Sequence, residues 1–512
     1  MRIHPLFQAA APHGSARRAP GALAAAGLAA LLALPQLTAS AQAERALPPG
    51  PVEARVEQAM DRIEALDGDY RAVIALTPEL RAQARSLDRQ RRMPGLLHGE
   101  PILLKDNIES RELPTTAGSL ALGDNVTGRD AALVAALRSE GAIILGKANL
   151  SEWANFRSVH SSSGWSAVGG QTRNAVDPAR TPCGSSSGSA VAVALGYVDV
   201  AIGTETSGSI VCPASMNGVV GFKPTHGLVS GDGIVPLALT QDTAGPIAKN
   251  AELAARTLAV MVNPDLEQAP AIRAGLLTLD SVTTLDGLRV GVFANTQGFD
   301  PRRDANLERV LEVLRQHGAT IIPELRITPY DGYGSDAYDV LLWEFRRDIA
   351  TYLAGLSEQV AVRSLDDLIR FNLEHAAEEL AVFDQSIFLR SQSLEMSEAE
   401  YRELRARTQR AMREEGLDRL FEEHELDVLI GITTGVAWMI DPVNGDASFG
   451  SSMARQAAVA GNPHVTLPLA GIRGLPHGIS LVGERWKDHE LASIALLVEQ
   501  TMKIAGSAGS AQ

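Results

Sequence analysis

Residues 203–227 read "GTETSGSIVCPASMNGVVGFKPTHG", and this stretch decides how the rest of the chain is interpreted. It opens with glycines and hydroxyl residues, and residues 183–189, "CGSSSGS", form a similar cluster just upstream. By composition both clusters are loops, and long loops in compact domains are usually either disordered or functional. Between them, "SAVAVALGYVDVAIGTET" predicts a small-residue helix that runs into a buried strand.

The flanking sequence predicts further helices and strands. Residues 51–92 carry apolar residues at three- or four-residue steps, which predicts packing helices, and residues 130–139 predict another helix. "GEPILLKDN", "GIVPLA", "LDVLIGITT" and "GISLVGERW" are of strand type, and a C-terminal helix is expected from about Asp488. Charged, leucine-containing sequence at about 338–423 predicts a helical insertion or lid. This alternation is typical of an α/β protein with a doubly wound or mixed sheet.

A phosphate-loop pattern at 141–148, "GAIILGKA", is a weak candidate for a nucleotide site. It fits G-x-x-x-x-G-K but ends in Ala148, where a Mg²⁺-binding Ser or Thr belongs. Its middle residues are apolar, whereas a phosphate cradle needs a loop that presents backbone N–H groups. We therefore interpret it as a buried strand that ends in a Gly-Lys turn.

A second candidate is the nucleophile elbow G-x-S-x-G, which "GSSSG" at 184–188 matches with Ser186 as nucleophile. The elbow of an α/β-hydrolase needs a strand directly before it, and the preceding "NAVDPARTPC" contains two prolines. A triad also needs a histidine, and His464, His477 and His489 lie in turn-rich or charged sequence typical of surface residues. The elbow remains the weaker alternative.

The third candidate uses a lysine as base. A hydroxyl needs a base to become a nucleophile at neutral pH, and a desolvated neutral lysine can serve. Lys105 follows three apolar residues of a predicted buried strand, so burial could lower its pKa. The alternative for a lysine at a strand end is a solvated surface charge.

Resemblance to a known family favours the third candidate. The stretch 203–227, with "LKDN", "TTAGS", "GKANLSEWA", "QDTAGPIA" and "AGNPHVTLPL…GLPHGISLVG" in order, resembles the amidase signature family. The resemblance covers nearly the whole mature chain. It implies a single large α/β domain, with a mixed β-sheet core flanked by helices on both faces, that hydrolyses amide C–N bonds.

The resemblance also implies a catalytic triad, carried over by position. Ser209 is the expected nucleophile, Ser185 the bridging serine after a cis peptide bond from Gly184, and Lys105 the base. The backbone N–H groups of Thr206, Ser207, Gly208 and Ser209 are expected to hold the oxyanion. No metal or organic cofactor is expected.

The two clusters depart from the common family pattern at four positions, Cys183, Ser187, Ser207 and Val211. A missing arginine at 211 removes a cation near the site. The variants resemble bacterial peptide amidases, which remove the amide from peptide C-termini. Hydrolysis of other acyl or aryl amides, an inactive binding protein and a glutamine-dependent amidotransferase subunit remain alternatives.

Composition limits the partners and the cross-links. The 512 residues carry a formal net charge of −15 and no basic stripe, which argues against nucleic acid or an anionic membrane and favours a small neutral or mixed substrate. The family resemblance implies that this substrate is an amide of a small molecule or peptide. The only two cysteines, Cys183 and Cys212, cannot form a disulfide scaffold or a zinc site. They are either two buried thiols or, if the clusters meet, one disulfide.

The N-terminus resembles a secretory signal. Arg2, Arg17 and Arg18 precede the apolar run 21–34, and small and polar residues follow to Ala43. The run is short for a membrane span, so a permanent anchor is the weaker alternative. We expect a signal peptide at 1–43 and an amidase domain at 44–512, in the periplasm or outside the cell and without stable membrane insertion after cleavage.

Overall fold

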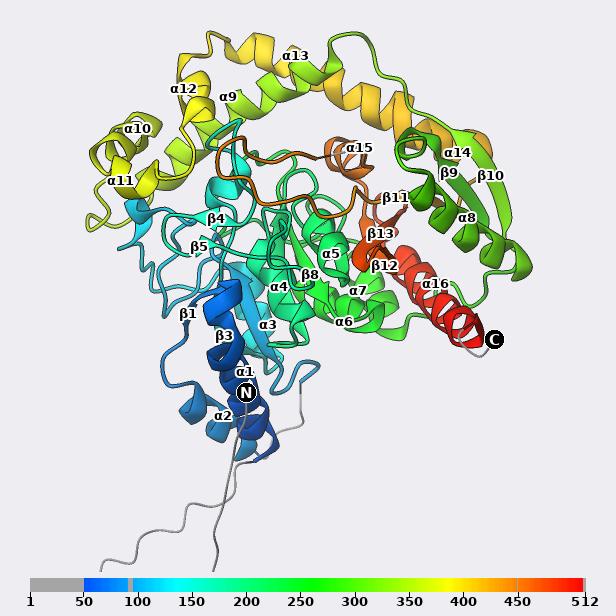
Figure 1. Cartoon of the computed structure of the whole chain (residues 1–512), viewed down its shortest axis with the longest axis horizontal. Helices are drawn as coiled ribbons and strands as arrows, with labels where there is room; N and C mark the ends of the chain where they lie inside the picture. The colour runs from blue at the N-terminus through cyan, green and yellow to red at the C-terminus, as the bar shows by residue number, and fades with distance from the viewer. Residues whose placement is uncertain (1–49, 91–94, 449, 510–512) are drawn as a thin grey trace, which may run out of the picture. The chain divides into compact units, whose positions relative to one another are not determined.

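An 11-stranded mixed sheet forms the centre of the protein (Figure 1). The computed structural model describes residues 50–90, 95–448 and 450–509, with side chains to 503. The strand order is β1-β3-β2-β6-β8-β7-β12-β13-β11-β9-β10. The strands are β1 (Val73–Leu76), β2 (Pro101–Lys105), β3 (Ile143–Ala148), β6 (Val200–Glu205), β7 (Val220–Lys223), β8 (Thr243–Ala248), β9 (Arg289–Phe293), β10 (Thr320–Leu325), β11 (Val428–Ile432), β12 (His464–Ile472) and β13 (Leu475–Val482). A separate hairpin pairs β4 (Trp165–Ser166) with β5 (Gly170–Gln171).

Helices cover both faces of the sheet, as the family resemblance implies. Alternate residues of β2 enter opposite cores, because successive side chains of a strand point to opposite faces: Ile102 and Leu104 join one cluster and Leu103 the other. The first core also contains residues of α3 (Ala132–Ser139), α6 (Ala251–Met261), α7 (Ala269–Thr278), α8 (Pro301–Gln316) and α16 (Asp488–Gly509). The second contains residues of α1 (Pro51–Tyr70), α2 (Leu80–Asp88), α4 (Ser187–Ala194) and α5 (Val211–Asn217).

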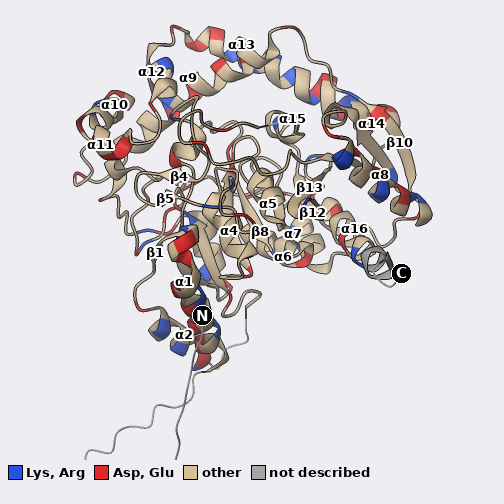
Figure 2. Cartoon of the chain, in the orientation of Figure 1, with Lys and Arg blue, Asp and Glu red and all other residues tan. Residues whose placement is uncertain are grey.

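The region predicted as an insertion is helical. It contains α9 (Tyr333–Ala354), α10 (Leu365–Glu374), α11 (Ala376–Glu379), α12 (Ser386–Ser393), α13 (Glu398–Met412), a π-helical segment at Arg413–Asp418 and α14 (Arg419–His424). Phe345 of α9 and Phe388 of α12 stack, and they pack edge-on against Phe156 and Trp153 of the central domain. Figure 2 shows acidic and basic side chains interspersed along α13, as expected for a solvated helix.

Three local predictions were wrong. Residues 51–92 are not all helical, because β1 separates α1 from α2 and pairs with β3. "GIVPLA" is not a strand; only Ile234 bridges to Ile108, and Pro236 has no N–H to continue a ladder. The Gly-Lys pair at 146–147 lies within β3 and not in a turn after it.

Two further predictions concern the N-terminus and membranes. The predicted signal peptide at 1–43 and the predicted mature start at Glu44 lie outside the described residues. Among the helices that are described, none is long and apolar enough to cross a bilayer.

Candidate active site

Lys105, the last residue of β2, is fully buried and points at a serine. Its Nζ lies 2.7 Å from Ser185 Oγ, 2.8 Å from Thr204 Oγ1 and 3.2 Å from the Thr204 carbonyl oxygen. Burial lowers the pKa of Lys105 to about 7, and the carboxylates of Asp242 and Glu205 act in the opposite direction. A large share of the amine is therefore neutral near pH 7 and able to take a proton.

The peptide bond from Gly184 to Ser185 is cis, as predicted. A side chain at position 184 would displace the Ser151 hydroxyl, since a Cβ would lie 2.1 Å from Ser151 Oγ. The Ser185 carbonyl accepts a hydrogen bond from the Ser151 N–H at 3.0 Å. This packing directs the fully buried Ser185 hydroxyl at Lys105.

Ser209 lies in the turn between β6 and α5, and the fold brings it to the first serine cluster. The N–H of Ser186 donates to the Ser209 carbonyl at 3.1 Å. Ser209 is partly exposed, and within the described residues its Oγ makes no hydrogen bond. Gly208 has φ of +94°, a left-handed conformation that favours glycine, so the turn depends on this residue.

The turn also presents unpaired backbone donors. Across the described residues, the N–H groups of Thr206, Ser207, Gly208 and Ser209 donate no hydrogen bond to the protein. The next two N–H groups, of Ile210 and Val211, donate to Glu205 Oε2 at 2.8 and 3.1 Å. Ser207 is exposed and Ser209 partly exposed, so solvent or a substrate can reach this turn, and unpaired N–H groups of this kind are able to hold an oxyanion.

Sequence reasoning did not identify three polar residues around the lysine. Thr204 accepts from Lys105, and Asn107 Nδ2 donates to Thr204 Oγ1 at 3.0 Å. The carboxylate of Asp242 accepts from Thr206 Oγ1 at 2.5 Å and from two backbone N–H groups of residues 237–238. Burial raises the pKa of Asp242 to about 7. All three lie in or beside the sequence blocks that carry the family resemblance. This position was the signal in the sequence that could have identified them.

A disulfide joins the two loops. Cys183 and Cys212 are bonded, with their Cα atoms 6.0 Å apart, so the alternative of two free thiols was wrong. Cys183 lies two residues before Ser185, and Cys212 lies three after Ser209. The cross-link therefore connects the loop that contains Ser185 to the loop that contains Ser209.

The nucleophile-elbow alternative finds no support. Ser186 is fully buried, and its hydroxyl is paired with the backbone of Thr204, donating to the carbonyl at 3.0 Å and accepting from the N–H at 3.1 Å. No strand directly precedes it. The prediction of surface histidines was also wrong for His464 and His477, which are buried in β12 and β13, where desolvation lowers their pKa values to about 3 and about 4.

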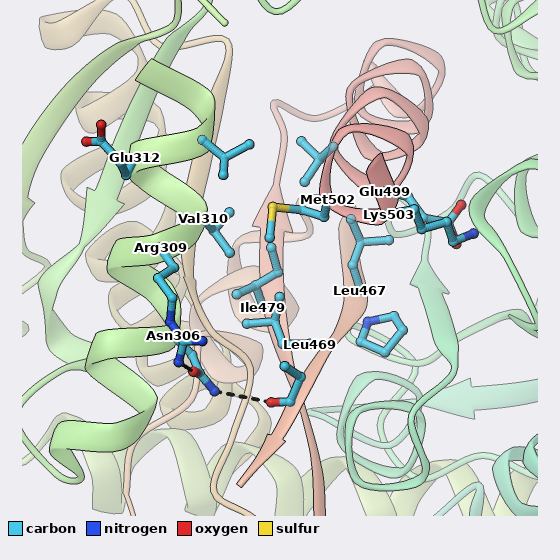
Figure 3. Close-up of a pocket in the computed structure, with 14 residues that line it drawn as sticks. Asn306, Arg309, Val310, Glu312, Leu467, Leu469, Ile479, Glu499, Met502 and Lys503 are labelled. Carbon is cyan, nitrogen blue, oxygen red and sulfur yellow. Dashed lines mark hydrogen bonds and ion pairs between the residues drawn. The ribbon is translucent and has the colours of Figure 1, made fainter. Parts of the chain in front are cut away.

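One cavity of the protein lies away from the predicted triad. It is mostly apolar, has a volume of about 670 Å³, and lies between α8, α16, β12 and β13, with Leu467, Ile479 and Met502 among its walls (Figure 3). None of the predicted triad residues lines it. In the described part of the chain, no three His, Cys, Asp or Glu side chains are placed to hold a metal ion.

The sequence and the fold are both similar to those of known amidases. The model of the family described as Amidase matches residues 54–492. The chain belongs to the amidase family. This amidase is 36% identical to a probable amidase of Arabidopsis thaliana over 470 residues, which cover 88% of this chain and 86% of that protein. It is a hydrolase that acts on amide C–N bonds.

Two further relatives of this amidase have more specific names. The crystal structure of peptide amidase from Stenotrophomonas maltophilia matches with a TM-score of 0.81 and 41% identity, over 88% of this chain and 94% of that one. A subunit of the glutamyl-tRNA(Gln) amidotransferase of Symbiobacterium thermophilum is 33% identical, over 87% of this chain and 93% of that protein.

Proposed function

We propose that this amidase removes the C-terminal amide of peptides, giving the free acid and ammonia, through Lys105, Ser185 and Ser209. The observation that carries the chemistry is the 2.7 Å hydrogen bond from buried Lys105 to Ser185, beside a turn with four unpaired N–H groups. The likeness to peptide amidase, at 41% identity over most of both chains, supports the substrate class.

The proposed reaction is acyl transfer to water. Neutral Lys105 takes a proton from Ser185, Ser185 takes one from Ser209, and Ser209 Oγ attacks the amide carbonyl. The N–H groups of residues 206–209 stabilise the tetrahedral oxyanion. The relay then returns a proton to the nitrogen, the C–N bond breaks, and water hydrolyses the acyl-enzyme by the same route.

Ammonia release from one peptide amide tests this proposal. Ser209→Ala and Lys105→Ala are expected to lower kcat by several orders of magnitude, since members of a catalytic unit are each essential, roughly 10⁴-fold or more. The matched control is Ser186→Ala, which removes a neighbouring hydroxyl that only bonds backbone and should keep turnover. Activity in Ser209→Ala, or its loss only in Ser186→Ala, would show that the wrong serine was chosen.

The substrate class is tested by a panel of amidated peptides, amino-acid amides, fatty amides and aryl amides. We expect the largest kcat/KM for amidated peptides. A preference for fatty or aryl amides would retain the amidase assignment and reject the peptide one.

The amidotransferase alternative has one observation in its favour, the 33% identity to a subunit of such an enzyme. The apolar Val211 and the predicted export signal favour the hydrolase. Glutaminase activity that exceeds hydrolysis of peptide amides would reverse this preference.

We also propose export, on the basic, apolar and small-residue order of residues 1–43. The expected mature chain begins near Glu44 and is found in the periplasm or the medium. N-terminal sequencing of the protein from its fractionated host checks this, and an intact N-terminus in the cytoplasm would contradict it.

A further inference from the structure

The apolar cavity between α8, α16, β12 and β13 is a space that the proposed amide hydrolysis does not use. Its volume of about 670 Å³ lies within the range of small-ligand sites, about 300 to 1,000 Å³. Leu467 and Ile479, which are paired across β12 and β13, form one wall. Val310 of α8 and Met502 of α16 point into the space between the two helices (Figure 3). Among the described residues that line the cavity, none is aromatic, so its interior suits an aliphatic group.

The middle of this cavity is a poor site for water. A buried water needs about two to four polar partners, whereas the side chains that surround the middle are those of valine, leucine, isoleucine and methionine. An aliphatic chain in the same space removes its own surface from water, and each buried methylene increases affinity about fourfold. The walls therefore favour an aliphatic chain over water.

A guanidinium lies at one end of the cavity and is held in place by its neighbours. Arg309 lines the cavity and donates to Asn306 Oδ1, and no carboxylate among the described residues pairs with it. Asn306 is fixed in turn, because its Nδ2 donates to the Ala470 carbonyl at 3.2 Å and lies 2.5 Å from Nε2 of buried His477 (Figure 3). A guanidinium can bind a carboxylate through two parallel hydrogen bonds. This end therefore suits the head of an anionic ligand.

The other charged residues of the lining already have partners. Glu312 pairs with Arg315 at 3.2 Å, and its carboxylate points away from the cavity (Figure 3). Lys503 pairs with Glu499 at 3.1 Å. Within the part of the chain that the structure describes, Arg309 is thus the lining cation that remains available to an anion.

We propose that this cavity binds a single-chain aliphatic carboxylate of medium length, with the chain between α8 and α16 and the carboxylate on Arg309. The site holds the molecule without reacting with it. The inference does not rest on the proposed function, since none of the predicted triad residues lines the cavity.

Calorimetry with octanoate, nonanoate and decanoate tests the aliphatic part of the site. We expect saturable binding of one molecule per chain, with affinity that increases about fourfold for each added methylene. Met502→Glu places a carboxylate among the apolar walls and is expected to weaken decanoate binding by about tenfold or more. Met502→Leu is the matched control, because it keeps an aliphatic side chain of similar size and should bind decanoate like the wild type.

A comparison of decanoate with decanol tests the charged end. Arg309→Gln is expected to weaken decanoate binding by about tenfold or more, because a charge-assisted pair is lost, and to leave decanol binding unchanged. Arg256→Gln is the matched control. It removes an exposed arginine of α6 that pairs with Glu252 at 2.6 Å and does not line the cavity, so both affinities should stay the same. Thermal unfolding of each variant shows whether it is folded.

The place of binding needs its own measurement, because carboxylates are also products of amide hydrolysis. Decanoate that carries a terminal diazirine is expected to label α8 or α16 on irradiation, and mass spectrometry of the digested protein locates the label. Labelling confined to other segments, no saturable binding of decanoate, or unchanged binding in folded Arg309→Gln and Met502→Glu would overturn the proposal. Binding that appears only after residues 504–512 are removed would also overturn it, and would assign the cavity to the chain's own C-terminal segment.

Discussion

At the scale of single residues, the proposed role of Lys105 as the base predicts how activity depends on pH. Its pKa falls from the usual 10.5 to about 7, so the neutral fraction, which is the proposed base, grows as pH rises through 7. We expect kcat/KM to rise with pH along a limb near 7 and then level off. A pH–rate profile with one peptide amide measures the limb, and a limb near pH 10 would contradict the buried neutral lysine.

Asp242 tunes this lysine. Its negative charge favours the protonated amine and so raises the pKa of Lys105 against the effect of burial. Asp242→Asn removes the charge and keeps the shape, so the acid limb is expected to move to lower pH. Glu344, whose charge raises the pKa of Asp242, provides the comparison. Glu344→Gln should shift the limb less, because it does not act on Lys105 directly.

The residues of the site were predictable to different degrees. Motif order predicts Lys105, Ser185 and Ser209 as the triad, and their catalytic roles stay a prediction; the cis bond before Ser185, which the same resemblance implies, is confirmed. The sequence did not predict that Thr204 and Asp242 lie near Lys105, because this proximity depends on which strands lie side by side. Whether Cys183 and Cys212 form a disulfide could not be decided for a related reason, because sequence spacing does not show that two loops lie together.

At the scale of elements, one buried arginine ties the helical region to the central domain. Arg157 is fully buried, and it bonds Glu152 at 2.5 Å, the Phe383 carbonyl at 3.0 Å and the Glu379 backbone of α11. Its guanidinium also lies 4.2 Å from the ring centre of Phe383. The central domain, through Arg157, and the end of α11 therefore share one cation.

Loss of this cation should destabilise the protein strongly. Arg157→Ala leaves the buried carboxylates of Glu152 and Glu379, which lie 2.5 and 3.4 Å from the guanidinium, without this cation. We expect the free energy of unfolding to fall by about 3–5 kcal/mol. Arg402→Ala, which breaks an exposed pair with Glu398 within α13, is the control and should cost less than about 1 kcal/mol. Urea unfolding followed by circular dichroism measures both variants. Equal losses of unfolding free energy would contradict the stabilising role of Arg157.

Elements were predictable where the pattern is local. The buried strand β2, the C-terminal helix from Asp488 and the helices of 338–423 follow from periodicity and length. The sequence did not predict β1, because its four residues are all half-buried and show no alternation of buried and exposed positions. Its partner β3 lies some 70 positions away, and only tertiary pairing makes it a strand.

At the scale of the whole molecule, the Cys183–Cys212 bond closes a loop with a sequence separation of 29. Closing a loop restricts the unfolded chain, and we expect the Cys183→Ser, Cys212→Ser double variant to lose about 2–4 kcal/mol of unfolding free energy. Its kcat should also fall, because both serine loops lose a shared restraint. Unchanged stability together with unchanged kcat would show that the disulfide neither stabilises the protein nor positions the two serine loops.

That cross-link has a practical consequence for anyone who makes the protein. In a host compartment that keeps thiols reduced, the Cys183–Cys212 bond does not form, and the loops that contain Ser185 and Ser209 are not cross-linked. Preparations of identical sequence can then differ in specific activity according to the redox state of the cell that made them. Counting free thiols in each batch before comparing rates distinguishes a weak variant from an unoxidised one.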